Sequence, residues 1–169
     1  MKRVLSIQDI SCIGKCSLTV ALPIISAMGI ETSILPTSIL STHTMFNDFT
    51  FRDLTDDMEP IKKHWQKEGF SFDAIYTGYL GSEKQITLVK DYFKTFGNTC
   101  KYIIVDPAMA DNGKLYSGFD KDFPLKMAKL CKYADVILPN ISEAAFMTGM
   151  PYPGENASNE CIKDLLLSL

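Results

Sequence analysis

The sequence lacks the excess of basic charge that nucleic-acid and membrane-surface proteins carry. Its 169 residues include 17 Lys and Arg against 20 Asp and Glu, which gives a formal net charge of −3. The basic residues are scattered rather than clustered, so we expect neither a nucleic-acid partner nor a membrane partner. No apolar run approaches the length of a membrane span. Hydrophobic residues make up 46% of the chain, enough for one domain with a core.

Cysteine is also sparse, and its spacing fits no metal or disulfide motif. The five cysteines form no close Cys-x-x-Cys pair, so the sequence predicts neither a disulfide framework nor a zinc site. The simplest interpretation is a set of reduced thiols, most of them buried. We therefore expect a cytoplasmic protein.

Three common signatures of nucleotide and hydrolase sites are missing. Gly14-Lys15 resembles the end of a P-loop, but no glycine stands upstream at the required spacing, which excludes a Walker motif. No Gly-x-Gly-x-x-Gly follows a predicted strand, so a dinucleotide fold is unsupported. The absence of a Gly-x-Ser-x-Gly elbow leaves a serine hydrolase triad unsupported as well.

Strand and helix patterns alternate along the whole chain. Several strands are nearly continuous Ile, Val and Leu runs, which is typical of a parallel sheet covered on both faces. We predict one α/β domain over residues 1–169, with a mostly parallel central sheet and helices on both faces. The predicted strands are 4–7, 32–40, 72–76, 101–105 and 136–138. The predicted helices are 16–28, 55–68, 82–97, 123–133, 142–148 and 158–169.

Polar residues follow each predicted strand. Ligands of open parallel sheets bind beyond the carboxyl ends of the strands, so these residues form the candidate site. Asn140 and Glu143, three residues apart on a strand-to-helix turn, suit a phosphate–metal complex, and Asp106 ends the preceding strand. The full set is Gln8, Asp9, Ser11, Ser41, Thr42, His43, Thr44, Thr77, Gly78, Tyr79, Asp106, Asp111, Asn140 and Glu143.

Each of these residues also has a purely structural interpretation. Asp106-Pro107 is a common turn starter, and Glu143 could simply favour the dipole of a helix start. A lone histidine is more often buried and satisfied than functional, although Thr42 and Thr44 on either side of His43 favour a pocket. The convergence of polar residues on one edge of the sheet is stronger than any single motif.

Five short motifs together resemble the pyridoxal and pyridoxamine kinases of the ribokinase-like superfamily. They occur in the expected order across essentially the whole chain, and they are similar to motifs of the related hydroxymethylpyrimidine kinases. The resemblance implies a three-layer ribokinase-like fold. The motifs are Ser6-Ile7-Gln8, Ser41-Thr42-His43-Thr44, Thr77-Gly78-Tyr79, Asp106-Pro107 and Pro139-Asn140-x-x-Glu143.

The resemblance also implies roles for individual residues, with ATP and Mg²⁺ as cofactors. Glu143 would act on the metal through bound water. Asp9 stands where many family members have a serine near the substrate ring, and Ala110 replaces a glycine that usually precedes Asp111. The implied ring-binding residues are Asp9, His43, Thr44 and Tyr79. The implied ATP and phosphate residues are Asp106, Asp111, Asn140 and Thr148.

The Gly-x-Gly-Asp motif that supplies the catalytic base in this family is absent from the 169 residues. We expect the chain to be the N-terminal part of a longer protein, with the base beyond Leu169 and little activity of its own. By resemblance, the full-length protein is a homodimer that phosphorylates the hydroxymethyl group of pyridoxal, pyridoxamine or pyridoxine. The alternatives are a hydroxymethylpyrimidine kinase, a sugar kinase, whose usual inserted strand lid is missing here, and a small-ring binding module without catalysis.

Overall fold

The computed structural model describes residues 1–154 and 156–169. Strands and helices alternate along most of it, as the sequence predicts. The elements are β1 (Arg3–Ser11), α1 (Leu18–Ala27), β2 (Glu31–Leu40), β3 (Phe51–Asp53), α2 (Thr55–Lys67), β4 (Ala74–Thr77), α3 (Glu83–Phe96), a 3₁₀ turn (Gly97–Thr99), β5 (Tyr102–Val105), β6 (Ala110–Asp111), β7 (Lys114–Leu115), α4 (Phe123–Cys131), β8 (Val136–Ile137), α5 (Ile141–Thr148) and α6 (Asn159–Ser168).

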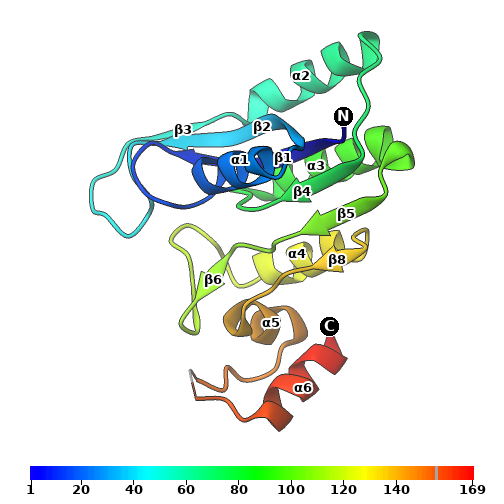
Figure 1. Cartoon of the computed structure of the whole chain (residues 1–169). Helices are drawn as coiled ribbons and strands as arrows, with labels where there is room; N and C mark the ends of the chain where they lie inside the picture. Colours follow the sequence, from blue (N-terminus) through cyan, green and yellow to red (C-terminus); the bar gives the residue numbers. More distant parts are fainter. Residues whose placement is uncertain (155) are drawn as a thin grey trace.

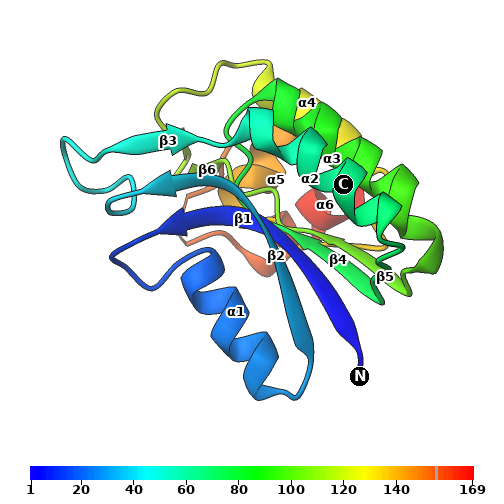
Figure 2. The same ribbon diagram turned by 90° about the horizontal axis from the view of Figure 1, so that it is seen from above.

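The central sheet has the order β3-β2-β1-β4-β5-β8. β1, β2, β4, β5 and β8 pair in parallel, and β3 is antiparallel to β2 at the edge. Helix α1 lies on one face of the sheet, while α2, α3 and α4 lie on the other (Figure 2). α5 and α6 follow at the β8 end (Figure 1). The mostly parallel sheet with helices on both faces is therefore confirmed.

Two predicted boundaries and two missing elements need correction. The first strand does not end at Ile7 but continues to Ser11, because β1 pairs with β2 as far as Ser11↔Leu40. Its pairing slips between Gln8 and Ile10, where Asp9 alone stands opposite Thr37 and Ser38, which marks a bulge on β2 opposite Asp9. The third strand begins at Ala74 rather than Phe72. The edge strand β3 and the β6–β7 hairpin were not predicted, since two- and three-residue strands carry no alternating pattern.

The main core lies between the sheet and helices α2, α3 and α4. Leu5 and Ile7 of β1 are fully buried there, together with Met58 of α2 and Tyr92 of α3. The ring of Tyr92 packs near Trp65, and its hydroxyl donates a 2.6 Å hydrogen bond to the carbonyl oxygen of Met58. Burial raises the pKa of Tyr92 well above its ordinary value, so the hydroxyl stays a donor. This bond ties α3 to α2 far from the strand ends.

We expect Tyr92→Phe to lower the free energy of unfolding by about 1 kcal/mol, the net contribution of one buried hydrogen bond. The ring packing survives in this variant, so a larger loss is not expected. Urea unfolding followed by circular dichroism measures the difference. A loss above about 3 kcal/mol would show that the bond holds α2 and α3 together more strongly than the contacts around it suggest.

Among residues 1–154 and 156–169, we find no helix with both the length and the apolar character needed to cross a bilayer.

Candidate active site

A cavity of about 1040 Å³ opens at the carboxyl ends of the parallel strands. It gathers residues from β1, from the loops after β2, β4 and β5, and from the β6–β7 hairpin. Six of the predicted ligand residues line it: Asp9, His43, Thr44, Tyr79, Asp106 and Asp111. The topology explains this convergence, because parallel strands end at the same edge of the sheet.

Asp9 is the most unusual polar group of the cavity. It lies on β1 opposite the bulge of β2 and is 5% exposed. The Ser11 hydroxyl donates a 3.2 Å hydrogen bond to Asp9 Oδ2, whereas Asp9 Oδ1 is buried without a partner in the described residues. Burial raises the pKa of Asp9, and hydrogen bonds from Ser17 and Ser11 partly offset this. A buried acceptor without a partner is costly, so the Asp9 carboxylate is a candidate ligand contact in the wall of the cavity.

The loops after β2 and β4 bring His43 and Tyr79 to the same cavity. The ring of His43 makes an edge contact with Phe46 at 4.9 Å between centroids. Tyr79 packs near Phe119 at 5.6 Å, and its carbonyl oxygen accepts a hydrogen bond from Thr37 Oγ1. Burial and the nearby charge of Asp9 raise the pKa of Tyr79, so its hydroxyl remains protonated. The cavity thus has an aromatic wall beside a carboxylate.

Two carboxylates, Asp106 and Asp111, line the cavity beyond β5, and Asp106 follows the strand directly. Burial raises the pKa of Asp106 to about 6, and its carboxylate accepts no hydrogen bond from the described residues. Tyr116, after the β6–β7 hairpin, has a pKa raised to about 12 by burial and by the charges of Glu143, Asp111 and Asp106. Three carboxylates therefore lie close enough to Tyr116 to disfavour its ionised form.

Asn140 and Glu143 lie behind this wall and do not line the cavity. The Asn140 side chain accepts a hydrogen bond from the backbone N–H of Glu143, and Glu143 Oε2 accepts one from the N–H of Asn140, so the pair forms a capping box on α5. Glu143 Oε1 accepts a third bond from the N–H of Met109 at 3.1 Å. Burial, with the charge of Asp106 adding to it, raises the pKa of Glu143 to about 7.

Thr148 is also outside the cavity lining. It ends α5, and its hydroxyl donates a 2.8 Å hydrogen bond to the carbonyl oxygen of Ala144 in the same helix. Asn140 further donates from Nδ2 to the carbonyl oxygen of Ala110, which fixes the start of the hairpin. Asn140 and Glu143 thus brace the hairpin from behind, while Thr148 lies at the far end of α5.

The cavity includes residues that the strand-end rule did not find. Lys15 and Cys16 come from the β1–α1 loop, and Lys114 and Tyr116 come from the hairpin and the segment after it. These loops were not predicted to fold over the strand ends. Gly14-Lys15 was noted only as a failed P-loop, although a glycine beside a lysine in the first loop of an α/β domain was an available signal.

Within the described residues, no three His, Cys, Asp or Glu side chains are grouped to hold a metal ion. Mg²⁺ is usually bound through one or two carboxylates and the phosphates of its nucleotide, so a larger protein cluster is not required. Asp106 and Glu143 influence each other's charge, and burial disfavours the ionised form of both. A cation beside Asp106 would relieve this, so Asp106 is the candidate Mg²⁺ ligand in the cavity; Glu143, with both oxygens hydrogen-bonded, could act on the ion only from behind the wall.

Residues 31–168 match the family described as phosphomethylpyrimidine kinase. The chain belongs to this family. A Bacteroides thetaiotaomicron protein assigned to the phosphomethylpyrimidine kinases and crystallised with pyridoxal is 43% identical, with a TM-score of 0.92 over 98% of this chain. The pyridoxal kinase of Lactobacillus plantarum is 37% identical, with a TM-score of 0.88 over the whole chain. The pyridoxal kinase of Actinobacillus pleuropneumoniae is 27% identical over 98% of it.

These relatives confirm the resemblance to the pyridoxal kinases and the ribokinase-like fold. The chain spans 58% of the length of the Bacteroides protein and 60% of the length of the other two. The cavity described above therefore belongs to the part of the fold that the relatives share with this chain.

Proposed function

We propose that the residues lining this cavity form the substrate side of the active site of a kinase. The kinase would use ATP to phosphorylate the hydroxymethyl group of pyridoxal, pyridoxamine or pyridoxine. One observation carries the proposal: Asp9, a carboxylate with one buried oxygen that lacks a partner in the described residues, lines the same cavity as the aromatic residue Tyr79. A flat ring with an N–H or O–H group would satisfy both. The 43% identity to a protein crystallised with pyridoxal supports this choice of ring.

The ring would lie among Asp9, His43, Thr44 and Tyr79. A vitamin B6 ring offers Asp9 a protonated ring nitrogen or a hydroxyl as donor, and either gives a charge-assisted hydrogen bond. The hydroxyl of Tyr79 stays protonated, so it can donate to a ring oxygen. The ring hydroxymethyl group would then point along the cavity toward Asp106.

The nucleotide would lie on the Asp106 side. Phosphoryl transfer depends mainly on positioning and on neutralising the charge of the phosphates. Asp106 would hold Mg²⁺ directly and Glu143 would reach it through water; when bound, the ion supplies positive charge to the transferring group. Asp111 and Asn140 would order the hairpin over the phosphates, and Thr148 would lie near them. We further propose that the domain over residues 1–169 is incomplete by itself.

A hydroxymethylpyrimidine kinase is the second candidate, because the matching family carries the pyrimidine kinase description. Its substrate also offers a donor to Asp9, through an amino group. Titrations of the chain with pyridoxal, pyridoxamine and hydroxymethylpyrimidine, followed by fluorescence, separate the two. We expect the B6 compounds to bind more tightly. Tighter binding of hydroxymethylpyrimidine would instead favour the hydroxymethylpyrimidine kinase.

We expect the 169-residue chain to show little or no turnover. No Gly-x-Gly-Asp motif is present in it, and loss of a general base alone lowers rates by about 10²- to 10⁴-fold. A coupled assay of ADP release with pyridoxal and MgATP measures this, with the full-length Lactobacillus plantarum pyridoxal kinase as the active reference. Turnover comparable to the reference would contradict the expectation.

Two further parts of the proposal have simple tests. Ring binding without any binding of ATP would instead favour a small-ring binding module. The homodimer is proposed from the family resemblance alone, and light scattering behind a sizing column tests it in the full-length protein. The cytoplasmic location is proposed from the cysteine pattern, which fits reduced thiols.

A further inference from the structure

Gln85 is a fully buried polar side chain with no part in the site described above. It lies in the first turn of α3, beside the apolar core residue Ile86. Buried amides are stable only when their hydrogen bonds are made, so its partners show what it holds in place. All of these partners lie outside α3, on β2, on β3, at the start of α2 and in the loop after β4.

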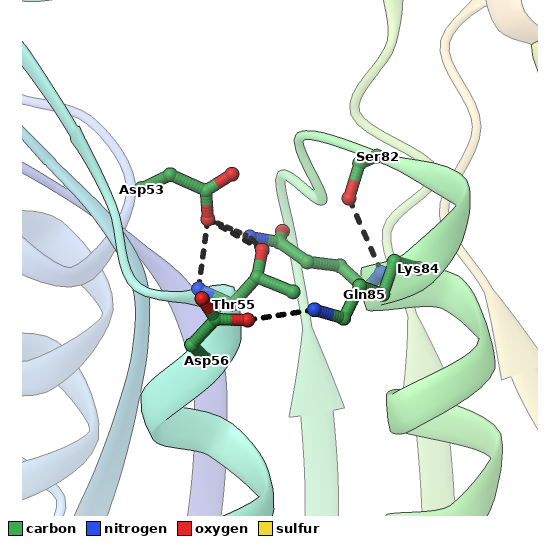
Figure 3. A network of polar contacts seen from close by, with 6 residues as sticks. All are labelled: Asp53, Thr55, Asp56, Ser82, Lys84 and Gln85. Atoms are coloured by element: carbon green, nitrogen blue, oxygen red, sulfur yellow. Dashed lines mark hydrogen bonds and ion pairs between the residues drawn. The ribbon is translucent and has the colours of Figure 1, made fainter.

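The Gln85 amide bridges three segments. Its Nε2 donates to the carbonyl oxygen of Thr37 in β2 and to Thr55 Oγ1 at the start of α2, each at 2.9 Å. A longer hydrogen bond of 3.2 Å joins the same Nε2 to Asp53 Oδ1 of β3. Its Oε1 accepts a 2.8 Å bond from the N–H of Gly81. Figure 3 shows Gln85 reaching across to Asp53 and Thr55, which also bond to each other.

These contacts fix the loop that carries Tyr79. Thr37 both receives a bond from Gln85 and donates from Oγ1 to the carbonyl oxygen of Tyr79 at 3.1 Å. Gly81 is held directly by Gln85, and the ring of Tyr79 lies beside it: a Cβ placed on Gly81 would make an ordinary contact of 3.5 Å with Tyr79 Cε1. The loop contains two glycines, Gly78 and Gly81, so its own backbone does little to restrict it.

We propose that Gln85 is a positioning residue for the ring ligand, acting through Gly81 and Tyr79. It fixes the N–H of Gly81, which lies beside the Tyr79 ring, and it bonds to Thr37, whose hydroxyl donates to the carbonyl oxygen of Tyr79; Tyr79 forms the aromatic wall of the cavity that Asp9 also lines. The inference rests on the proposed function, since it assigns Tyr79 to the ring pocket. It differs from a role in stability alone, because it couples a buried amide to ligand affinity.

The test is Gln85→Met, which keeps the length of the side chain and removes its hydrogen bonds. We expect pyridoxal affinity of the chain to fall by 5-fold or more, because the ring of Tyr79 is no longer held. The matched control is Tyr92→Phe, which removes a buried hydrogen bond from the same helix away from the cavity and should leave the affinity within 2-fold. Titrations are run where circular dichroism shows each variant to be folded.

A second measurement separates this inference from the proposed function. The ring resonances of Tyr79, assigned with Tyr79→Phe in tyrosine-labelled protein, should shift in ligand-free Gln85→Met and stay unchanged in Tyr92→Phe. If the wild-type chain does not bind pyridoxal, the proposed function fails, and these resonances alone decide the inference. Unchanged Tyr79 resonances, or unchanged pyridoxal affinity, in a folded Gln85→Met variant would overturn it.

If Gln85→Met does not fold, the double variant Asp53→Asn with Gln85→Glu takes its place. Glu at position 85 retains an acceptor for the N–H of Gly81, and Asn at position 53 can donate to the new carboxylate instead of repelling it. We expect this pair to keep pyridoxal affinity within 3-fold of wild type, whereas Gln85→Glu alone should lose 5-fold or more. Equal affinities for the single and double variants would contradict the positioning role.

Discussion

Replacing Asp9 with asparagine is expected to weaken pyridoxal binding by about 10- to 100-fold, because a charge-assisted hydrogen bond contributes about 1.5–3 kcal/mol. The carboxylate has one oxygen bonded to Ser11 and one buried without a partner, so the ligand supplies the missing donor. The asparagine keeps the shape and removes the charge. Fluorescence titration at pH 7.5 measures the change.

The matched control is Asp111→Asn, which removes one negative charge from the same cavity on the proposed phosphate side. It should leave pyridoxal affinity within 2-fold. If the loss of negative charge in the cavity were enough to weaken binding, the two variants would lose affinity equally.

The ratio of wild-type to Asp9→Asn affinity for pyridoxal should also shrink at low pH. Burial raises the pKa of Asp9, so its carboxylate is protonated at a higher pH than an exposed aspartate. A ratio independent of pH would contradict the role of the charge.

Asp106→Asn is expected to stabilise the fold at pH 8 by about 1–3 kcal/mol while it abolishes phosphoryl transfer in the full-length protein. The pKa of Asp106 is about 6 in the fold, against 3.8 ordinarily, and burial is the cause. Above pH 6 the carboxylate is ionised in both states, so the folded state carries the full cost of the buried charge. Asparagine avoids that cost, although it no longer offers a negative charge to a metal ion.

The sign of the pH dependence follows from the raised pKa. Below about pH 3.8 the Asp106 carboxyl is protonated in both the folded and the unfolded state, so wild type and Asp106→Asn do not differ in stability through this charge. As the pH rises from 3.8 to 6, the wild type becomes progressively less stable than the variant. Urea unfolding of both proteins at pH 4.5 and pH 8 measures this difference.

Asp111→Asn again serves as the control for stability, because Asp111 is exposed in the same cavity and should change it by less than about 0.5 kcal/mol. Equal stabilities of wild type and Asp106→Asn at pH 8 would mean that the Asp106 carboxylate is not held away from water. Undiminished kinase activity of the full-length Asp106→Asn variant would contradict the proposed role of Asp106 in binding the metal and nucleotide.

The strand-end rule found nine of the residues that line the cavity, because it depends on topology alone. Once five strands run in parallel, the polar residues after them must meet at one edge, and Asp9, His43, Tyr79 and Asp106 do so. The rule failed for the β1–α1 loop and the β6–β7 hairpin. Their residues reach the cavity by folding back over it, and the periodicity of the sequence carries no information about such loops.

Glu143 shows a different limit. Its position at a helix start was clear, and the capping box with Asn140 is local. The bond from Glu143 to the N–H of Met109 joins residues 34 positions apart, and it moves the carboxylate behind the cavity wall. The role of Gln85 could not be predicted either. A polar residue on a helix is expected to be exposed, and only the packing of β2 and β3 against α3 shows that Gln85 is buried.

The sequence by itself determined the parallel α/β architecture and the family, because strand and helix periods and short turn motifs are local properties of the chain. Only the tertiary structure decided that Asp9 lies opposite a bulge of β2 with an oxygen lacking a partner, that Glu143 braces the hairpin, and that Gln85 holds the Tyr79 loop. Each of these facts depends on burial and on hydrogen bonds between segments distant in sequence, and those are set when the layers pack together.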